Sequence, residues 1–336
     1  MRYIIIGAGA VGGTIGARLH EGGHDVVLVA RGAHLAALRA GGLRFGTPEG
    51  FRTVAAPVAA GPEEVALRPG DVLLLAVKTQ DTPAALAAWA PRPVAGGGTA
   101  AERLPLVCAQ NGVENERLAL RVFREVLAMC VWLPSGHLEP GVVTAAGTPL
   151  SGVLRLGGYP GGDGGAVAAA IAADLSRSCF SSSADAGVMG WKYTKLLGNL
   201  ANALDAVAGP RDDEPVRALR RRALAEGVAV LAAAGVPHRD PAEQSRLAGE
   251  LLRMEPVRGA ERSGSSSWQS LARGTGSIEA DHLNGEIALL GRLHGVPTPV
   301  NEALQRLAND FARSGRRPGS LTDEELAGLS GGSARG

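Results

Sequence analysis

The sequence predicts an α/β protein in two parts: a domain built on a parallel sheet, followed by a domain made only of helices. Up to about residue 185, short apolar runs alternate with segments of helical periodicity, which is typical of parallel strands joined by helical crossovers. From about residue 187 onward every long segment has the helical period, and Gly and Pro mark the breaks. We therefore place a first domain at 1–185, a helical domain at 186–330 and a tail at 331–336, and we expect a cleft between the two domains.

The first domain contains four apolar runs that are short enough to be buried strands. They are "YIII" (3–6), "VVLVA" (26–30), "VLLLAV" (72–77) and "PLVCA" (105–109). Helices are expected at 11–23, 115–129 and 163–177, where apolar residues recur at helical spacing. The stretch 141–159 is rich in β-branched and turn residues and lacks a helical period, so we expect antiparallel strands that complete the sheet.

The second domain is expected to consist of helices at 187–207, 213–235, 241–254 and 277–295. They are separated by "AGPRDDEP", "AGVPHRDP" and "GVPTP", in which Gly and Pro end a helix. The segment 258–276 is rich in Ser and Gly, and we interpret it as a loop.

Composition excludes several classes of protein. Of the 336 residues, 45% are hydrophobic and 20% charged, an ordinary balance for a globular chain. Lys and Arg total 34 against 33 acidic residues, so nothing suggests a nucleic acid or an anionic membrane as partner. No apolar run is long enough to span a membrane, and only Met1 and Arg2 precede the first strand, so we expect no signal peptide. The odd count of three widely spaced cysteines favours a reducing compartment, and we expect a cytoplasmic protein.

The stretch "GAGAVG" carries the first functional motif. It comprises Gly7, Gly9, Ala10, Val11 and Gly12, directly after a predicted strand and at the start of a predicted helix. Glycines in this pattern permit a tight turn and the close approach of a pyrophosphate, which the helix N-terminus attracts. A plain glycine-rich turn is the alternative, since the chain has 48 glycines. A second strand within about 30 residues favours a Rossmann-type dinucleotide-binding domain.

Arg31 follows the second predicted strand, at a position where an acidic residue would bind the ribose hydroxyls of NAD. An arginine there suits the 2′-phosphate of NADP instead. The alternative is a surface arginine at the end of a strand. We expect NADPH (or NADP) to be the cofactor.

Two more strands end in polar residues, Lys78 and Asn111. The pair Asn111–Gly112 often forms a hairpin, but a helix is expected next, so we predict a turn between strand and helix. Ligands of open α/β sheets bind outside the carboxyl ends of the strands. Alone, either residue would be expected to be solvated. Together with the glycine turn and Arg31, they suggest one binding edge that holds the cofactor.

The stretch "HEGGH" (20–24) matches the pattern of a zinc protease. That pattern needs both histidines on one intact helix, and two glycines between them usually end a helix. We interpret the match as a coincidence and expect no metal.

Residues 191–204, "WKYTKLLGNLANAL", would form an apolar helix with one polar stripe. At about 100° per residue, Trp191, Lys195, Asn199 and Asn202 fall on one narrow face. Buried polar groups are costly unless they are satisfied, so this face meets water, a polar element or a ligand. Further along, Ser277 is a plausible N-cap with Glu279 in the first turn, where an acid also simply favours the helix dipole.

The chain resembles the ketopantoate reductase family (2-dehydropantoate 2-reductases) over nearly its whole length. The resemblance rests on ordered motifs: "GAGAVGG" (7–13), "VK" (77–78), "QNGVENE" (110–116), "WKYTKLLGN" (191–199), "SSSWQS" (265–270), "SIEADHLNG" (277–285) and "GVPTPVN" (295–301). It implies a Rossmann domain with a helical domain, and NADPH-dependent reduction of ketopantoate to pantoate in the pathway to pantothenate and coenzyme A.

The resemblance also implies roles for single residues. Lys195 would protonate the carbonyl oxygen, and Glu279 would hydrogen-bond the nascent hydroxyl. The substrate would be held by Asn111, Asn199 and Ser267, and we add Asn202 from the stripe. Lys78 would lie by the nicotinamide and Arg31 by the 2′-phosphate.

Three substrate-holding positions depart from the family pattern. Gly264 stands where an Asn is frequent, Ser270 where an Asp is common, and Ala203 where a second helix Asn is usual. These departures spare the cofactor and proton-transfer residues, so the reaction type is better supported than the substrate.

The chemistry is coherent without the resemblance. Hydride delivery to a ketone develops alkoxide charge, which a lysine ammonium stabilises and neutralises. The main hypothesis is an enzyme that reduces a 2-oxo acid. Reduction of a different branched 2-oxo acid and a non-catalytic NADPH-binding redox sensor remain alternatives. A homodimer through the helical domain stays open.

Overall fold

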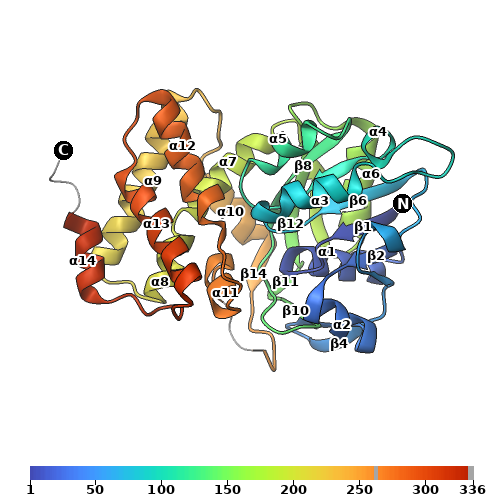
Figure 1. The fold of residues 1–336 in the computed structure, drawn as a ribbon, viewed down its shortest axis with the longest axis horizontal. Coiled ribbons are helices and arrows are strands. Elements are labelled where there is room, and N and C mark those ends of the chain that lie inside the picture. The colour runs from blue at the N-terminus through green and yellow to red at the C-terminus, as the bar shows by residue number, and fades with distance from the viewer. Residues whose placement is uncertain (261–263, 332–336) are drawn as a thin grey trace. The chain divides into compact units, whose positions relative to one another are not determined.

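The computed structural model describes residues 1–260 and 264–331, and Figure 1 shows the fold. The chain divides into two compact units. The first consists of Met1–Lys192 and Ala242–Arg262, and the second of Tyr193–Pro241 and Ser263–Gly336. The segment 242–262, which we expected in the helical domain, is thus part of the first unit. Within the described residues, no helix combines the length and the apolar character needed to cross a membrane.

An eight-stranded sheet forms the centre of the first unit. Its order is β13-β12-β8-β7-β6-β1-β2-β5, and it is parallel except that β12 runs antiparallel to β8. From β5 to β8 this is the 3-2-1-4-5-6 order of dinucleotide-binding sheets, so the predicted parallel sheet is confirmed. The strands are β1 (Arg2–Ile6), β2 (Asp25–Val29), β5 (Val58–Ala59), β6 (Asp71–Leu75), β7 (Leu106–Cys108), β8 (Val126–Trp132), β12 (Gly152–Gly158) and β13 (Phe180–Ala184).

Helices cover both faces of this sheet, because its strands alternate apolar side chains between two cores. Tyr3 and Ile5 of β1 point into one core, and Ile4 and Ile6 point into the other. The first core is closed by α1 (Ala10–Glu21) and α6 (Gly165–Arg177), and the second by α3 (Thr82–Trp89), α4 (Ala100–Arg103) and α5 (Asn115–Leu120).

The helix predicted at 115–129 is wrong in its second half, where α5 ends at Leu120 and β8 begins at Val126. The apolar residues of 126–131 are all buried inside the sheet, so tertiary burial overrides the helical spacing of the sequence. The segment 141–159 does form strands, as predicted, but not all of them complete the central sheet. Only β12 joins the central sheet, whereas β10 (Val142–Ala145) pairs with β3 (Leu43–Thr47) in a second sheet.

That second sheet has the order β4-β3-β10-β9, with β4 (Gly50–Val54) and β9 (Ser135–Gly136) at its edges. The remaining strand of the 141–159 stretch, β11 (Gly147–Pro149), pairs with β14 (Leu252–Met254). The helix predicted at 241–254 therefore ends earlier, as α10 (Pro241–Leu251). Helix α2 (Gly32–Gly41) packs beside β3 and β5.

The second unit consists, in its described residues, only of helices, as predicted. The helix expected at 187–207 is two helices, α7 (Val188–Asn199) and α8 (Asn202–Ala208), and the loop expected at 258–276 contains α11 (Ser266–Ala272). The others are α9 (Glu214–Ala233), the 3-10 turn η3 (Glu279–His282), α12 (Asn284–His294), α13 (Pro299–Ser314) and α14 (Asp323–Gly331). Of the tail predicted at 331–336, only Gly331 lies within the described residues.

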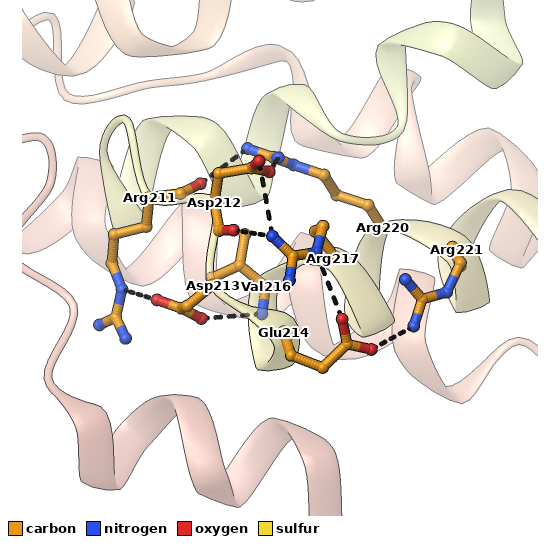
Figure 2. A network of polar contacts seen from close by, with 8 residues as sticks. All are labelled: Arg211, Asp212, Asp213, Glu214, Val216, Arg217, Arg220 and Arg221. Carbon is orange, nitrogen blue, oxygen red and sulfur yellow. Dashed lines mark hydrogen bonds and ion pairs between the residues drawn. The ribbon is translucent and has the colours of Figure 1, made fainter.

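A network of charged residues begins helix α9 (Figure 2). Asp213 is its N-cap: one carboxylate oxygen accepts from the amide of Val216, and the other accepts from Arg211. Glu214 receives hydrogen bonds from both Arg217 and Arg221, which lie one and two turns later. Single exposed ion pairs contribute little, so the cap is the main stabilising element here.

Candidate functional site

The glycine turn after β1 has the geometry of an anion cradle. Gly7 has φ +100°, and a Cβ there would lie 2.8 Å from the backbone nitrogen of Val77. A Cβ on Gly12 would lie 2.1 Å from the carbonyl oxygen of Gly7. Gly9, the N-cap of α1, has no side chain to cap the first amides of the helix, which leaves the positive end of the helix available to an anion.

Gly9 differs from the other two glycines because a Cβ there would meet little protein. Among the described residues outside its chain neighbours, only Cδ2 of His137 lies within 4 Å of that position, at 4.0 Å. A side chain at residue 9 would therefore occupy the space directly above the turn. The open space and the uncapped helix start are compatible with a dinucleotide pyrophosphate.

The four predicted binding positions lie along one edge of the sheet. Ile6 pairs in register with both Val29 and Leu75, and Leu75 pairs with Cys108. The residues that follow these four strand ends therefore leave the sheet at the same level. They include Gly7, Arg31, Lys78 and Asn111, so the structure brings the predicted cofactor residues of the first unit to one rim.

Arg31 is the N-cap of α2, and its side chain is 76% exposed. Its guanidinium donates to Oδ1 of Asp81 at 2.8 Å. Asp81 belongs to the 3-10 turn η2 (Thr79–Asp81), which Lys78 precedes as its N-cap. An incoming phosphate at Arg31 would therefore compete with the Asp81 carboxylate for the same guanidinium.

A buried hydrogen-bond network holds the turns that carry Lys78 and Asn111. The side-chain amide of Gln110 donates to the carbonyl oxygen of Val77 at 2.9 Å and to Oγ1 of Thr82 at 2.8 Å. Thr82 in turn donates to Oδ1 of Asn115, whose amide donates to the carbonyl oxygen of Asn111 at 3.2 Å. As predicted, the Asn111–Gly112 turn leads into a helix, α5.

Beneath this network lies a buried ion pair that sequence reasoning missed. Nζ of Lys192 donates to the carbonyl oxygen of Gln110 at 3.0 Å and contacts Oε1 of Glu116. The two charged side chains are 1% and 0% exposed. Burial raises the pKa of the Glu116 carboxyl, while the Lys192 ammonium opposes that rise. The sequence did offer one sign of this lysine, because Lys192 lies three residues before Lys195 on the same apolar helix.

Two histidines beside the glycine turn were also missed. The rings of His34 and His137 lie 4.3 Å apart. Nε2 of His34 binds the carbonyl oxygen of Ala8, and its Nδ1 accepts from the amide of Gly141. Nδ1 of His137 binds the carbonyl oxygen of Val142. The histidines are separated by more than 100 residues and belong to no motif, so no sequence signal connects them.

The other histidines singled out in the sequence do not form a helical zinc motif. Helix α1 ends at Glu21, so His20 lies on the helix and His24 beyond it. Across the residues that the structure describes, no three potential metal ligands cluster.

In the second unit, Lys195 and Asn199 lie one turn apart on α7 and are both half-buried. Nδ2 of Asn199 is a buried donor without a hydrogen-bond partner in the described structure, which suits a residue that binds a ligand. Seen down the helix axis, Lys192 lies about 60° from Lys195, on the same side as Asn199. Trp191 is not part of this polar face, because it is buried against Ala128 and Cys130 of β8.

The wheel argument that placed Asn202 beside Lys195 is wrong, because α7 ends at Asn199 and α8 starts at Asn202. The helical spacing cannot be continued across residues 200–201. The backbone carbonyl oxygen of Asn202 instead accepts from Oγ of Ser265, the N-cap of α11. Asn202 therefore lies beside the helix that carries Ser267.

Ser267 and Glu279 are buried, at 3% and 5% exposed. Ser267 lies in the first turn of α11, and Glu279 begins η3. The expected N-cap, Ser277, is not one, since the residue before η3 is Ile278. Burial lowers the pKa of Arg273, while the charge of Glu279 opposes that change, so the two groups interact electrostatically. Arg273 falls within the segment we interpreted as a loop and was missed.

The structure shows how the residues at the three departures from the family pattern are accommodated. A Cβ on Gly264 would lie 2.7 Å from Cγ of Trp268, whose ring fills that space. Oγ of Ser270 donates to the carbonyl oxygen of Ser266 at 3.1 Å, inside the helix. Ala203 is 2% exposed, so an amide there would be buried in the helical core.

Comparisons with known proteins agree with this architecture. The family model described as ketopantoate reductase PanE/ApbA matches residues 3–161, and the model of the C-terminal part of that family matches 187–312. A 2-dehydropantoate 2-reductase of Mycobacterium tuberculosis is 30% identical over 89% of this chain and 94% of its own. The chain belongs to the ketopantoate reductase family. It is an oxidoreductase that acts on a CH–OH group of a small molecule.

Two solved structures are also similar to this chain over nearly its whole length. A PanE/ApbA family ketopantoate reductase from Ralstonia eutropha JMP134 is 31% identical, with a TM-score of 0.74 over 94% of this chain and 100% of its own. A D-mandelate dehydrogenase, solved with NADH and anilino(oxo)acetate, has a TM-score of 0.77 over 94% of this chain and 99% of its own. At 22% identity, the second likeness shows the fold alone.

Proposed function

We propose that the protein reduces 2-dehydropantoate (ketopantoate) to pantoate with NADPH, in the pathway to pantothenate and coenzyme A. Family membership supports the reaction type. The observation that carries the proposal is the pairing of Lys195 and Asn199 on α7, where the buried amide of Asn199 has no hydrogen-bond partner. A cation and an available amide donor one turn apart suit a 2-oxo acid, which presents a carbonyl and a carboxylate oxygen.

In the proposed mechanism, a nicotinamide dinucleotide supplies the hydride when it is bound. The Lys195 ammonium donates a hydrogen bond to the substrate carbonyl oxygen and transfers its proton as negative charge develops there. The carboxylate of Glu279 accepts a hydrogen bond from the resulting hydroxyl. Asn111, Asn199, Asn202 and Ser267 hold the substrate, and Lys78 lies by the nicotinamide.

The cofactor assignment rests on the first unit. The glycine turn and the uncapped start of α1 suit a pyrophosphate, and the exposed guanidinium of Arg31 suits a 2′-phosphate. NADPH is therefore the proposed cofactor. NADH is the alternative, because Arg31 is already paired with Asp81.

A second candidate substrate is a 2-oxo acid with a larger side chain. The indole of Trp268 fills the space beside Gly264, next to the buried Ser267, where the resembling family often has an asparagine. Replacing an amide by an aromatic ring favours a more apolar substrate. The dehydrogenase with the same fold was solved with an anilino(oxo)acetate, an aromatic 2-oxo acid derivative.

We also propose a homodimer as the working assembly. A ketopantoate reductase from Staphylococcus aureus with the same fold is described as dimeric. Sedimentation velocity tests this directly, since a monomer at micromolar concentration would contradict it.

A panel of 2-oxo acids, assayed by the loss of NADPH absorbance, tests the proposed function. The panel includes ketopantoate, other branched 2-oxo acids and aromatic ones. Turnover of ketopantoate with the highest kcat/KM supports the proposal. Turnover of other members without ketopantoate would reject the substrate, and the absence of turnover with every member would reject the reductase in favour of a non-catalytic NADPH-binding protein.

A further inference from the structure

We propose that Asn284 is a positioning residue for substrate binding, because its side chain holds the break between α7 and α8 (residues 200–201) in place. Asn199 and Asn202 lie on either side of that break. This inference rests on the proposed function, since it assumes that these two amides hold the substrate. The first observation is a hydrogen bond: Nδ2 of the fully buried Asn284 donates to the carbonyl oxygen of Leu200 at 3.0 Å.

The carbonyl of Leu200 needs a partner from outside the two helices. α7 ends at Asn199, and Ala201, the N-cap of α8, accepts a backbone bond from the amide of Asp205 at 2.9 Å. Leu200 lies between these two points and is buried. A buried carbonyl without a hydrogen bond is costly, so the donor from Asn284 stabilises the break itself.

Acceptors on both sides determine how the amide of Asn284 is oriented. Besides Leu200, its Nδ2 contacts Oδ1 of Asn301 at 3.0 Å. The amide of Asn301 in turn donates to the carbonyl oxygen of Ala223 and to Oε2 of Glu226. Its oxygen must therefore face Asn284. With a backbone carbonyl at one end and a carboxylate at the other, only one arrangement of the two amides satisfies the network.

Asn284 joins the break to the segment that contains Glu279. It is the first residue of α12, and η3, which begins at Glu279, ends two residues earlier at His282. A second, weaker attachment comes from α11, where Oγ of Ser265 donates to the carbonyl oxygen of Asn202 at 3.5 Å. The side chain of Asn284 therefore sets where the substrate amides lie relative to the carboxylate that is proposed to bind the hydroxyl.

The side chain of Asn284 is not arranged for the greatest stability alone. Its Oδ1 is buried and has no hydrogen-bond partner among the described residues. An unsatisfied buried oxygen costs stability, and such costs are typical of functional positions. This supports a role in function for the two hydrogen bonds that the amide donates.

Loss of these donors should displace the substrate-holding groups. The buried carbonyl of Leu200 would lose its side-chain donor, so the two helix ends should shift until it meets water or another donor. A displacement of about 1 Å can lower the rate on the order of 10²-fold. The glycine turn that is proposed to bind the cofactor belongs to the other unit. The effect should therefore appear in kcat and in the KM of the 2-oxo acid, but not in the affinity for NADPH.

The test compares Asn284→Leu with the wild type, because leucine has the branching of asparagine but no donor. The substrate is the 2-oxo acid that the wild type turns over with the highest kcat/KM. We expect kcat/KM for this acid to fall roughly 10- to 100-fold, with KM raised at least about 3-fold. The Kd of NADPH should stay near the wild-type value. If the leucine variant does not fold, Asn284→Ala should show the same division between KM and Kd.

The matched control is Leu326→Ala, a buried position on α14, which carries no residue of the proposed site. Loss of this core side chain lowers stability. Partial unfolding reduces the amount of active enzyme and so lowers the apparent kcat, but it leaves KM unchanged. A merely structural role of Asn284 would give the same pattern as this control, so a raised KM separates positioning from stability.

A double-mutant cycle tests whether Asn284 acts through the amides at the break. In the background of Asn199→Ala or Asn202→Ala, the substitution Asn284→Leu should raise KM by a smaller factor than it does in the wild type. An unchanged KM in the single variant, or the full effect in both backgrounds, would overturn the inference and leave the proposed function standing. If the wild type turned over no 2-oxo acid, the proposed function would fall and this inference with it.

Discussion

Single residues of the glycine turn have two separable roles, which the structure distinguishes by the space around them. Gly12 is required for packing, because any side chain would collide with the carbonyl oxygen of Gly7. Gly9 has an ordinary φ of −74° and open space above it, so we propose that its lack of a side chain serves the ligand.

The contrast predicts different outcomes for two equivalent substitutions. Gly12→Ala should lower the free energy of unfolding by about 1–3 kcal/mol or more, through overpacking. Gly9→Ala should cost about 1 kcal/mol or less, the scale of an N-cap effect, yet weaken NADPH binding at least about tenfold. Denaturant unfolding and fluorescence titration measure the two effects. Equal stability loss in both variants would contradict this division of roles.

Lys195 is the residue on which the proposed reaction depends most. Lys195→Ala should lower kcat by a factor on the order of 10²–10⁴, because the developing alkoxide loses its proton donor. The dissociation constant of NADPH should stay near the wild-type value, which serves as the control for folding. Near-normal turnover in this variant would remove Lys195 from the role of general acid.

Arg31 and Asp81 together predict the choice of cofactor. Arg31→Asp should reduce the preference for NADPH over NADH by roughly 10- to 100-fold, because a charged hydrogen bond to the phosphate is replaced by repulsion. Asp81→Asn should have the opposite effect, since it releases the guanidinium from a competing carboxylate. The ratio of kcat/KM values for the two cofactors measures both. An unchanged ratio in both variants would exclude this pair from the phosphate site.

At the scale of elements, α7 is attached to the turn after β7 by a buried ion pair. Lys192 reaches the carbonyl oxygen of Gln110 and the carboxylate of Glu116, and Gln110 holds Val77, the residue before Lys78. One buried pair therefore supports two of the turns that carry predicted binding residues. The main effect of the pair is to hold these two turns in place, because buried ion pairs add little net stability compared with apolar packing.

Removing one partner of that pair should therefore be costly. Lys192→Met should lower the free energy of unfolding by about 3–5 kcal/mol at neutral pH, because it leaves the buried Glu116 carboxylate without a partner. The double variant Lys192→Met with Glu116→Leu should recover much of the loss. Urea unfolding of the three proteins tests this, and additive losses would contradict the proposed pairing.

The same variant has a predicted pH dependence. Burial raises the pKa of Glu116 in the folded state, and without Lys192 the main influence that opposes this rise is lost. A raised carboxyl pKa means that the folded protein holds the proton more tightly than the unfolded chain does. The stability of Lys192→Met should thus be highest below the ordinary glutamate pKa of 4.5 and fall as the pH rises through the raised value.

Elements differ in how far the sequence predicts them. β1 and α1 were predictable, because the glycine spacing fixes both the end of the strand and the start of the helix. The strand in the second half of 115–129 was not predictable, because apolar residues at helical spacing can also fill a buried strand. The break between α7 and α8 follows Gly198 and Asn199, residues that often end a helix, and the place of Asn202 was misjudged because this signal was not used.

The candidate site follows the same rule. Residues in local motifs, such as Gly7 and Lys195, could be proposed from the sequence because their chemistry and spacing are visible in a short window. His34 and His137, or Glu116 and Lys192, meet only through the topology of the sheet. Such pairs depend on the register of strands far apart in sequence, which no local pattern encodes.

At the scale of the molecule, cofactor binding should be visible as stabilisation. A ligand at about 100 times its dissociation constant raises the free energy of unfolding by about 2.7 kcal/mol. We expect NADPH at that concentration to raise Tm by several degrees, and the same concentration to stabilise Gly9→Ala by about half as much or less, because a tenfold weaker site gains about 1.4 kcal/mol. Differential scanning fluorimetry measures this. An equal shift in the wild type and the variant would show that NADPH binds away from the glycine turn.

Helix α7 belongs to both compact units, since the first unit's main segment ends at Lys192 and the second begins at Tyr193. Adding or deleting one residue within it would turn Lys195 by about 100° relative to Lys192. Laboratory chimeras that join the two halves of different relatives should keep Lys192 and Lys195 three residues apart.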